Sequence, residues 1–230
     1  MLGLTESSAL EQLRAMSVYF DGDLTEGLDE AKFTLDNSKG KGFITSYTVL
    51  KGFSVRTYNI KFNEDFKIKL KFSEKQPYYF SYLVNGYLYH KFDTEDHHYK
   101  IEKNQSFIIA SKPKAVADVI FPANVLIQMS IIIINKEELE EIDSKNSNRL
   151  QEELKQIELD NNKNQPFRYT GKILPNLSQY ADILINNERT DLVGRLLVEG
   201  AAKNILAKQL ESFDKIEKDS ENSEIKLTKS

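Results

Sequence analysis

The three histidines of the chain, His90, His97 and His98, are the side chains best suited to chemistry near neutral pH. A metal centre on a β-barrel strand needs two histidines one residue apart, with a glutamate and a third histidine further along, so that the ligands converge on one ion. His97 and His98 are adjacent, so a strand would point them to opposite faces, and the polar segment 93–96 before them, with three acidic residues, is typical of an exposed loop. The sequence therefore predicts no metal site and no catalytic residue.

His90 lies in a β-like segment where polar and aromatic side chains alternate. On a strand it shares a face with a phenylalanine, and the preceding β segment adds a tyrosine and a serine to that face. Such mixtures orient small ligands at the mouth of a β-barrel, and the alternative is a histidine satisfied within the core. An arginine and a tyrosine of an earlier β segment either join this site or face outward. The candidate ligand residues inside the barrel are Arg56, Tyr58, Tyr79, Ser81, His90 and Phe92.

Composition excludes several classes of function. The chain has 230 residues, 40% hydrophobic and 29% charged, which is typical of a soluble protein with one substantial core. It has no cysteine, which excludes disulfides and Cys-ligated zinc and suits a reducing cytoplasm. Its net charge is −4 with lysines interleaved among acids, so this chain alone lacks the basic face that DNA binding requires. We expect no signal peptide and no membrane span, and the motifs of common enzyme classes are missing.

The elements that would position these residues are mostly short strands, which the pattern predicts between residues 43 and 134. A capped helix over residues 9–20 precedes them, and residues 21–41 are loop-like. Asn85-Gly86 is typical of a type I′ hairpin turn, whose register puts Ser81 and His90 on one face. Strands at this spacing favour an antiparallel sandwich or barrel.

After Asn135 the pattern predicts amphipathic helices. A broken helix is expected over residues 136–157, and a last helix over 190–216 has apolar side chains on two nearly opposite sides. Such a helix needs two packing partners, which are the chain's own core alone or that core and a second subunit. Glu199 and Lys203, one turn apart, form either a solvated pair or a charged contact at a dimer interface. The candidate dimerisation residues are Leu197, Val198, Glu199, Ala201, Lys203 and Ile205.

Four segments carry a resemblance to a known family: FSYLVNG at 80–86, IEKNQSFII at 101–109, YTGKILP at 169–175 and RLLVEGAAKNILAKQL at 195–210. In order and spacing they resemble AraC-type transcriptional regulators, and the last two are most similar to the branch of the pyochelin-type siderophore regulators. The resemblance spans roughly residues 40–230. Where sugar-sensing members have a glycine, this chain has Asn104, which tolerates the left-handed conformation, so we expect the turn to persist.

The resemblance implies a cupin-like sensing and dimerisation domain, followed in that family by a DNA-binding domain with two helix-turn-helix units. Residues 224–230 look like the entry to that second domain. The chain is therefore expected to be a regulator cut at its linker, and the alternative is a naturally truncated regulator.

We therefore expect an α+β fold, in which an N-terminal antiparallel β-barrel of cupin-like, jelly-roll type is followed by a C-terminal helical subdomain. The expected divisions are a helix and arm over 1–41, the barrel over 42–135, the helical dimerisation subdomain over 136–216 and a linker over 217–230. The expected function is regulatory: a cytoplasmic ligand-sensing domain without enzymatic activity or cofactor. It would bind a small-molecule effector, form a homodimer and reach DNA only through the C-terminal domain. The alternatives are a small metal-dependent cupin enzyme, such as an isomerase or dioxygenase, and an interaction module with a filled barrel.

Overall fold

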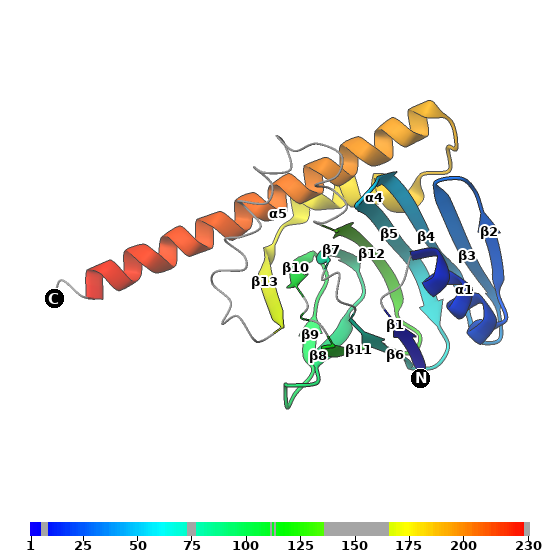
Figure 1. The fold of residues 1–230 in the computed structure, drawn as a ribbon, viewed down its shortest axis with the longest axis horizontal. Coiled ribbons are helices and arrows are strands. Elements are labelled where there is room, and N and C mark those ends of the chain that lie inside the picture. The colour runs from blue at the N-terminus through cyan, green and yellow to red at the C-terminus, as the bar shows by residue number, and fades with distance from the viewer. Residues whose placement is uncertain (6–8, 73–76, 111, 113, 136–165, 228–230) are drawn as a thin grey trace.

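The chain folds into two facing β-sheets with helices on the outer side of the larger sheet (Figure 1). The structure is a computed structural model that describes residues 1–5, 9–72, 77–110, 112, 114–135 and 166–227. Its first elements are β1 (Leu2–Thr5), α1 (Ala9–Phe20), β2 (Asp23–Glu26), β3 (Glu30–Asn37), β4 (Gly40–Leu50), β5 (Phe53–Phe62), β6 (Phe66–Lys71), β7 (Tyr78–Asn85) and β8 (Leu88–Phe92). Then follow β9 (Tyr99–Ile101), β10 (Gln105–Ala110), β11 (Val116–Phe121), β12 (Leu126–Ile134), β13 (Phe167–Ile173), the short 3-10 helix η1 (Pro175–Leu177), α4 (Ser178–Asn186) and α5 (Leu192–Leu227).

The smaller sheet has the strand order β1-β6-β11-β8-β9, and the larger one has β13-β10-β7-β12-β5-β4-β3-β2. The described strand pairs are antiparallel except β1 with β6. Alternation along β5 sends Tyr58 and Ile60 into the space between the sheets and Phe53 and Val55 to the outer face. The larger sheet is therefore apolar on both sides. This architecture confirms the expected fold class, a jelly-roll barrel followed by helices.

The Asn85-Gly86 turn does not form a hairpin, so that prediction is wrong. Strand β7 pairs with β10 and β12 in the larger sheet, whereas β8 pairs with β9 and β11 in the smaller one. A type I′ turn needs positive φ at both central residues, and of the two only Gly86 has it, at +88°. A Cβ at Gly86 would lie 2.5 Å from the carbonyl oxygen of Leu126, so the chain crosses between the sheets at a residue without a side chain. The inward faces were nevertheless predicted correctly, because both sheets face one interior.

Residues 21–41 contain the strands β2 and β3, which corrects the expectation of a loop. In β3 the buried Ala31, Phe33 and Leu35 alternate with polar residues, a pattern that suits a strand with one solvent-facing side. Strand β3 pairs with β4 from Asn37↔Gly40 onward, so the sheet is continuous across the expected boundary at residue 41. The predicted N-terminal helix is confirmed as α1. The turn at Asn104 also adopts the expected left-handed conformation, with φ +60°.

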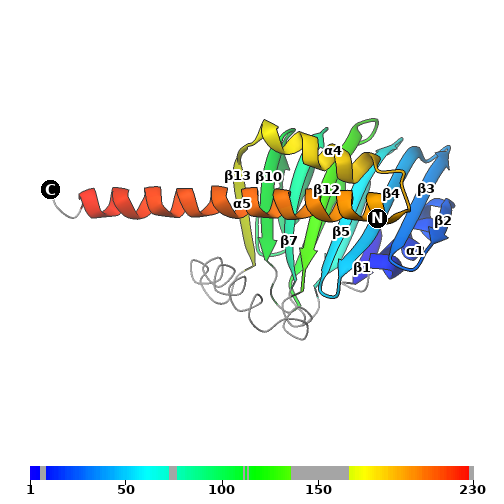
Figure 2. The same cartoon turned by 90° about the horizontal axis from the view of Figure 1, so that it is seen from above.

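Helices α4 and α5 cover the outer face of the larger sheet (Figures 1 and 2). Along α5, Val198, Ile205 and Phe213 fall on one stripe that packs on this face. Val198, Ala201 and Ile205 are each at most 4% exposed within the single chain, which corrects their assignment to a subunit interface. The reason is the second apolar face of the sheet: the sequence indicated the chain's own core as one partner of the helix, but not which side of the helix contacts it. Leu197 is 45% exposed, and Glu199 and Lys203 form the expected ion pair near the surface.

Helix α5 continues to Leu227, which corrects the expectation of a polar tail after residue 216. Its C-terminal part projects beyond the β13 edge of the sheet (Figure 2). The helix predicted over residues 136–157 lies outside the described residues. Within the described chain, no helix combines the length and the apolar character that a membrane span requires.

Candidate functional site

One cavity between the two sheets brings together most of the candidate ligand residues. Its volume is about 90 Å³ and its lining is mostly apolar. Phe92 is buried next to the cavity residue His90, with the two ring centroids 4.7 Å apart, but does not itself line the cavity. The role of the candidate residues in ligand binding remains a prediction. The five candidate residues that line the cavity are Arg56, Tyr58, Tyr79, Ser81 and His90.

Arg56 is the only formally charged residue among those described around this cavity. It is 7% exposed, and its Nη1 donates to Oε1 of Gln12 at 2.5 Å. Its Nε is buried without a hydrogen-bond partner in the described part of the chain, where no carboxylate lies within ion-pair distance of it either. An unpaired buried charge is unfavourable. The cavity can therefore accept a group that compensates this charge.

Gln12 and Met16 reach the cavity from α1, and sequence reasoning missed both of them. They lie four residues apart, beside Leu13, on the buried side of the helix, and Gln12 is 6% exposed. A glutamine on the apolar side of a short amphipathic helix was the available signal. Because α1 contributes these side chains, movement of this helix would change the size of the cavity.

His90 is held in its neutral form with a defined tautomer. Its Nδ1 lies 2.8 Å from Nη1 of Arg168, and a guanidinium only donates hydrogen bonds, so Nδ1 accepts and the ring proton is on Nε2. Burial, and next the positive charge of Arg168, lower the pKa of His90 from 6.5 to about 3. At neutral pH this residue is thus an uncharged hydrogen-bond donor at Nε2.

Arg168, at the start of β13, connects the two sheets through side-chain contacts. Its guanidinium donates to both carboxylate oxygens of Glu95, at 2.5 and 3.0 Å, and lies 3.7 Å from the ring centroid of Tyr99. Its side chain is only 6% exposed. Sequence reasoning missed this residue, because its partners lie 73 and 78 positions earlier and no local pattern joins them.

The remaining histidines do not approach the cavity. His97 and His98 are exposed between β8 and β9, as the sequence predicted. Among the described residues, no group of three or more His, Asp or Glu side chains could hold a metal ion. The cavity itself has one histidine and no carboxylate among its described lining residues.

Ser81 links the cavity to α5 through the sheet. Its side chain lines the cavity, while its backbone oxygen accepts a hydrogen bond of 2.8 Å from Nε2 of Gln209. Gln209 is 1% exposed and lies on the stripe of α5 that faces the sheet. A shift of β7 at Ser81 would therefore act directly on the long helix.

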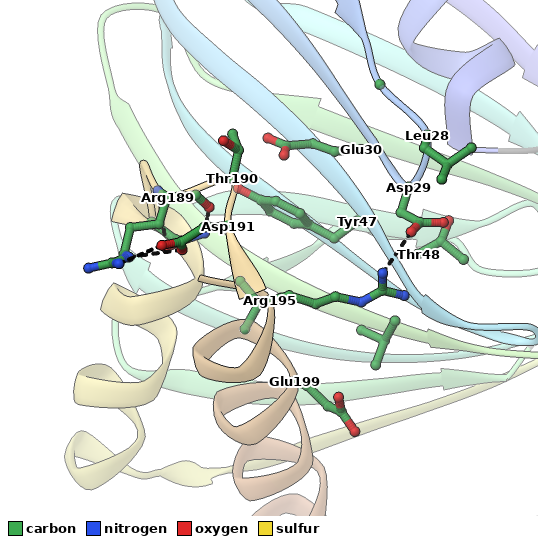
Figure 3. Close-up of a pocket in the computed structure, with 14 residues that line it drawn as sticks. Leu28, Asp29, Glu30, Tyr47, Thr48, Arg189, Thr190, Asp191, Arg195 and Glu199 are labelled. Atoms are coloured by element: carbon green, nitrogen blue, oxygen red, sulfur yellow. Dashed lines mark hydrogen bonds and ion pairs between the residues drawn. The ribbon is translucent and has the colours of Figure 1, made fainter. Parts of the chain in front are cut away.

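A second cavity, of about 290 Å³, lies where the β2–β3 turn and β4 meet the start of α5 (Figure 3). Arg195 of α5 spans it to pair with Asp29 at 3.0 Å, and the other ion pair drawn there joins Arg189 and Asp191. Burial raises the pKa of the Glu30 carboxyl on its wall. Asp29 and Asp191 are therefore already paired with arginines of this chain. We interpret this cavity as the joint that holds the beginning of α5 on the sheet.

The sequence matches the family described as the regulatory protein PchR N-terminal domain, over residues 39–227. A comparison with curated proteins finds no match. Among solved structures, the fold is similar to the AraC-like transcriptional activator CuxR, at 9% identity and a TM-score of 0.39, over 88% of this chain and 65% of CuxR.

Two further solved structures are similar at lower coverage. They are the nickel complex of the bacterial pirin YhhW from Escherichia coli (8% identity, TM-score 0.33, 67% of this chain and 56% of that one) and a mutant of the oxalate decarboxylase OxdC from Bacillus subtilis (6% identity, TM-score 0.30, 50% and 28%). The chain thus spans less than two thirds of the length of each of these three proteins. Likenesses this distant carry no argument about function.

The family match covers most of the chain, including β5, β7 and β8 around the cavity and the helix α5 that packs on the outside. It confirms the family that the sequence resemblance named. The chain therefore belongs to the family of the PchR N-terminal domain, a domain of a regulatory protein.

Proposed function

We propose that this regulatory domain senses a small-molecule effector in the cavity between its sheets and transmits the bound state to α5. It would act in the cytoplasm as the sensing part of an AraC-type regulator, whose DNA contacts come from a DNA-binding domain. The observation that carries the proposal is the position of Ser81: its side chain lines the cavity and its backbone oxygen bonds Gln209 of α5. A ligand that favours one position of β7 would shift the population of α5 positions.

The size of the cavity constrains how an effector would enter. Small-molecule pockets usually have volumes of about 300–1,000 Å³, and this one has about 90 Å³. A larger effector therefore requires the cavity to expand. Helix α1 is the element best placed to allow this, because its Gln12 and Met16 form part of the wall. The proposal assigns no catalysis to the domain, which is supported by the family and by the single neutral histidine at the cavity.

The test is a small-molecule screen by thermal shift, followed by hydrogen exchange on α5 with each ligand that stabilises the protein. A ligand of the cavity is expected to raise the unfolding midpoint and to change exchange in α5 around Gln209. The variant Ser81→Val fills part of the cavity and is expected to lose the stabilisation. Stabilising ligands that leave α5 unchanged would contradict transmission. Stoichiometric iron, zinc or nickel in the purified protein would instead favour the metal-dependent enzyme.

We further propose that the domain forms a homodimer through the exposed apolar side of α5 and α4. Leu192, Val193, Leu196 and Leu197 are 71, 48, 58 and 45% exposed, and Ile183 of α4 adds a further 37% exposed side chain. Scattered apolar residues are normal on a surface, but four within six positions of one helix form a contiguous patch. Of the dimerisation residues expected from the sequence, Leu197 belongs to this patch.

Leu196→Asp is expected to weaken the dimer at least about tenfold, because a carboxylate would lie within an apolar contact. Sedimentation equilibrium measures the dissociation constant. The matched control is Val18→Asp, which changes an 84% exposed apolar residue on α1 and should leave the constant unchanged. A wild-type protein that remains monomeric at high concentration would contradict the dimer without affecting the sensing proposal.

A further inference from the structure

We propose that the effector carries a single negative charge, a carboxylate on a small and otherwise apolar body, and that Arg56 is the residue that binds this group. This inference rests on the proposed sensing function and specifies the chemical class of the ligand. It follows from the charge state, the hydrogen-bonding capacity and the size of the cavity.

The two most buried arginines described in this barrel differ in their charged partners. Arg168 forms a bidentate ion pair with Glu95 and a neutral contact with His90. Among the described residues, Arg56 donates only to the neutral amide of Gln12, and its Nε is buried and unbonded. A guanidinium matches a carboxylate through two parallel N–H···O bonds, and Nε is one of the donors available for such a pair. A carboxylate ligand would provide the missing counter-charge.

The other polar groups of the cavity also favour an acceptor as ligand. Because Nδ1 of His90 accepts from Arg168, its ring donates from Nε2. The hydroxyl groups of Ser81 and Tyr58 can donate as well, and no described lining residue is a carboxylate. A cationic ligand would meet the uncompensated charge of Arg56 and find no acidic partner. The lining therefore selects against cations and favours anions.

The number of charges and the size follow from the rest of the lining. One guanidinium compensates one negative charge, so a dianion such as phosphate would leave a charge in an apolar cavity. The remaining walls are largely aliphatic and aromatic. The volume of about 90 Å³ equals roughly three water molecules at ~30 Å³ each, so among organic acids the cavity favours the smallest ones. The expected class is thus a small apolar monocarboxylate.

The experiment titrates the intact protein with sodium propionate and sodium butyrate and, in parallel, with propionamide and butyramide at equal ionic strength. The amides have nearly the same shape and no charge. The acids are expected to raise the unfolding midpoint and to bind at least tenfold more tightly than the amides. The side-chain Nε–H signal of Arg56 in a ¹H–¹⁵N spectrum, assigned by its loss in Arg56→Gln, is expected to move with the acids and to stay in place with the amides.

Arg56→Gln is expected to remove the preference, so that acid and amide bind equally weakly. Its unfolding midpoint without ligand is expected to equal or exceed that of the wild type, because an uncompensated buried charge is gone. Arg56→Lys keeps the charge but loses the fork and is expected to retain part of the preference. If Arg56→Gln does not fold, Arg56→Lys and the wild-type spectrum test the proposal instead. Arg14→Gln, which removes an exposed arginine paired with Glu26, is the matched control and should respond like the wild type.

If acids and amides bind equally to the wild type, the anion assignment is overturned while a ligand-binding cavity remains. If neither acids nor amides bind and Arg56 Nε–H does not move, the anion assignment fails. The sensing proposal is then tested by the thermal-shift screen alone. It fails separately if no ligand from that screen changes hydrogen exchange in α5.

Discussion

Replacing Arg168 with methionine is expected to lower the free energy of unfolding by about 3 kcal/mol, because it leaves Glu95 without its partner and opens the junction between the sheets. Breaking a fully buried ion pair typically costs about 3–5 kcal/mol, and we use the lower end because the Glu95 side chain is 24% exposed. The substitution also removes the contact with Tyr99 and the hydrogen bond to His90. Urea unfolding followed by circular dichroism measures the change.

The chain offers a matched control for this prediction. Arg189 also pairs with an acid through two hydrogen bonds, to Asp191, but its side chain is 55% exposed. Exposed pairs contribute little to stability, so Arg189→Met should unfold at nearly the wild-type denaturant concentration. A double-mutant cycle with Glu95→Gln separates the ion pair from the other contacts of Arg168. Equal effects of Arg168→Met and Arg189→Met would refute the structural role of Arg168.

The local alternation of the chain predicted which side chains face the interior, but not which strands pair. Ser81 and His90 were placed on one face through a hairpin that does not exist. They nevertheless meet at one cavity, because side-chain direction follows from the period of a strand, which is a local property. Strand pairing depends on contacts between distant segments, such as β7 with β12, which a single sequence does not encode in any short pattern.

The same distinction explains the errors in the helices. The apolar stripe of α5 was visible, and its need for two partners was inferred from the sequence. Which side would contact the sheet depended on the second apolar face of β5, β7 and β12, and this face exists only once these strands are neighbours. Arg168 was missed for a related reason, since its importance arises from Glu95 and His90 in a distant segment. In contrast, Gln12 carried a local signal, a polar residue on a buried helical face.

The junction and the cavity are physically coupled, because Arg168 fixes the tautomer of a histidine that lines the cavity. Ser81 on the opposite sheet contributes both a cavity side chain and the backbone oxygen that holds Gln209. A ligand between His90 and Ser81 would therefore contact both sheets at once. Such contacts would transmit a change in the distance between the sheets to α5.

The stability of the domain is expected to fall in acid through His90, in a window set by its pKa. The native pKa is about 3, and the ordinary value is 6.5, so between these values the unfolded chain binds a proton that the native protein does not. Stability therefore rises with pH across this window and is lost as the pH falls from 6.5 towards 3, at up to about 1.4 kcal/mol per pH unit. Below pH 3 this contribution no longer changes.

His90→Gln isolates this effect, because a glutamine still offers Arg168 an acceptor oxygen but does not titrate. Near neutral pH the wild type is expected to be the more stable protein. The difference in unfolding free energy between the two proteins should shrink as the pH falls, by about 4 kcal/mol from pH 6.5 to pH 3. Only the wild type loses the contribution of a neutral buried histidine. Unfolding free energies from urea at several pH values measure this, and the exposed His97→Gln serves as the control. The two proteins contain the same carboxylates, so the comparison isolates the contribution of His90. Parallel curves for wild type and His90→Gln would mean that His90 is hydrated or charged in the native protein, and the assignment of its tautomer by Arg168 would then be wrong.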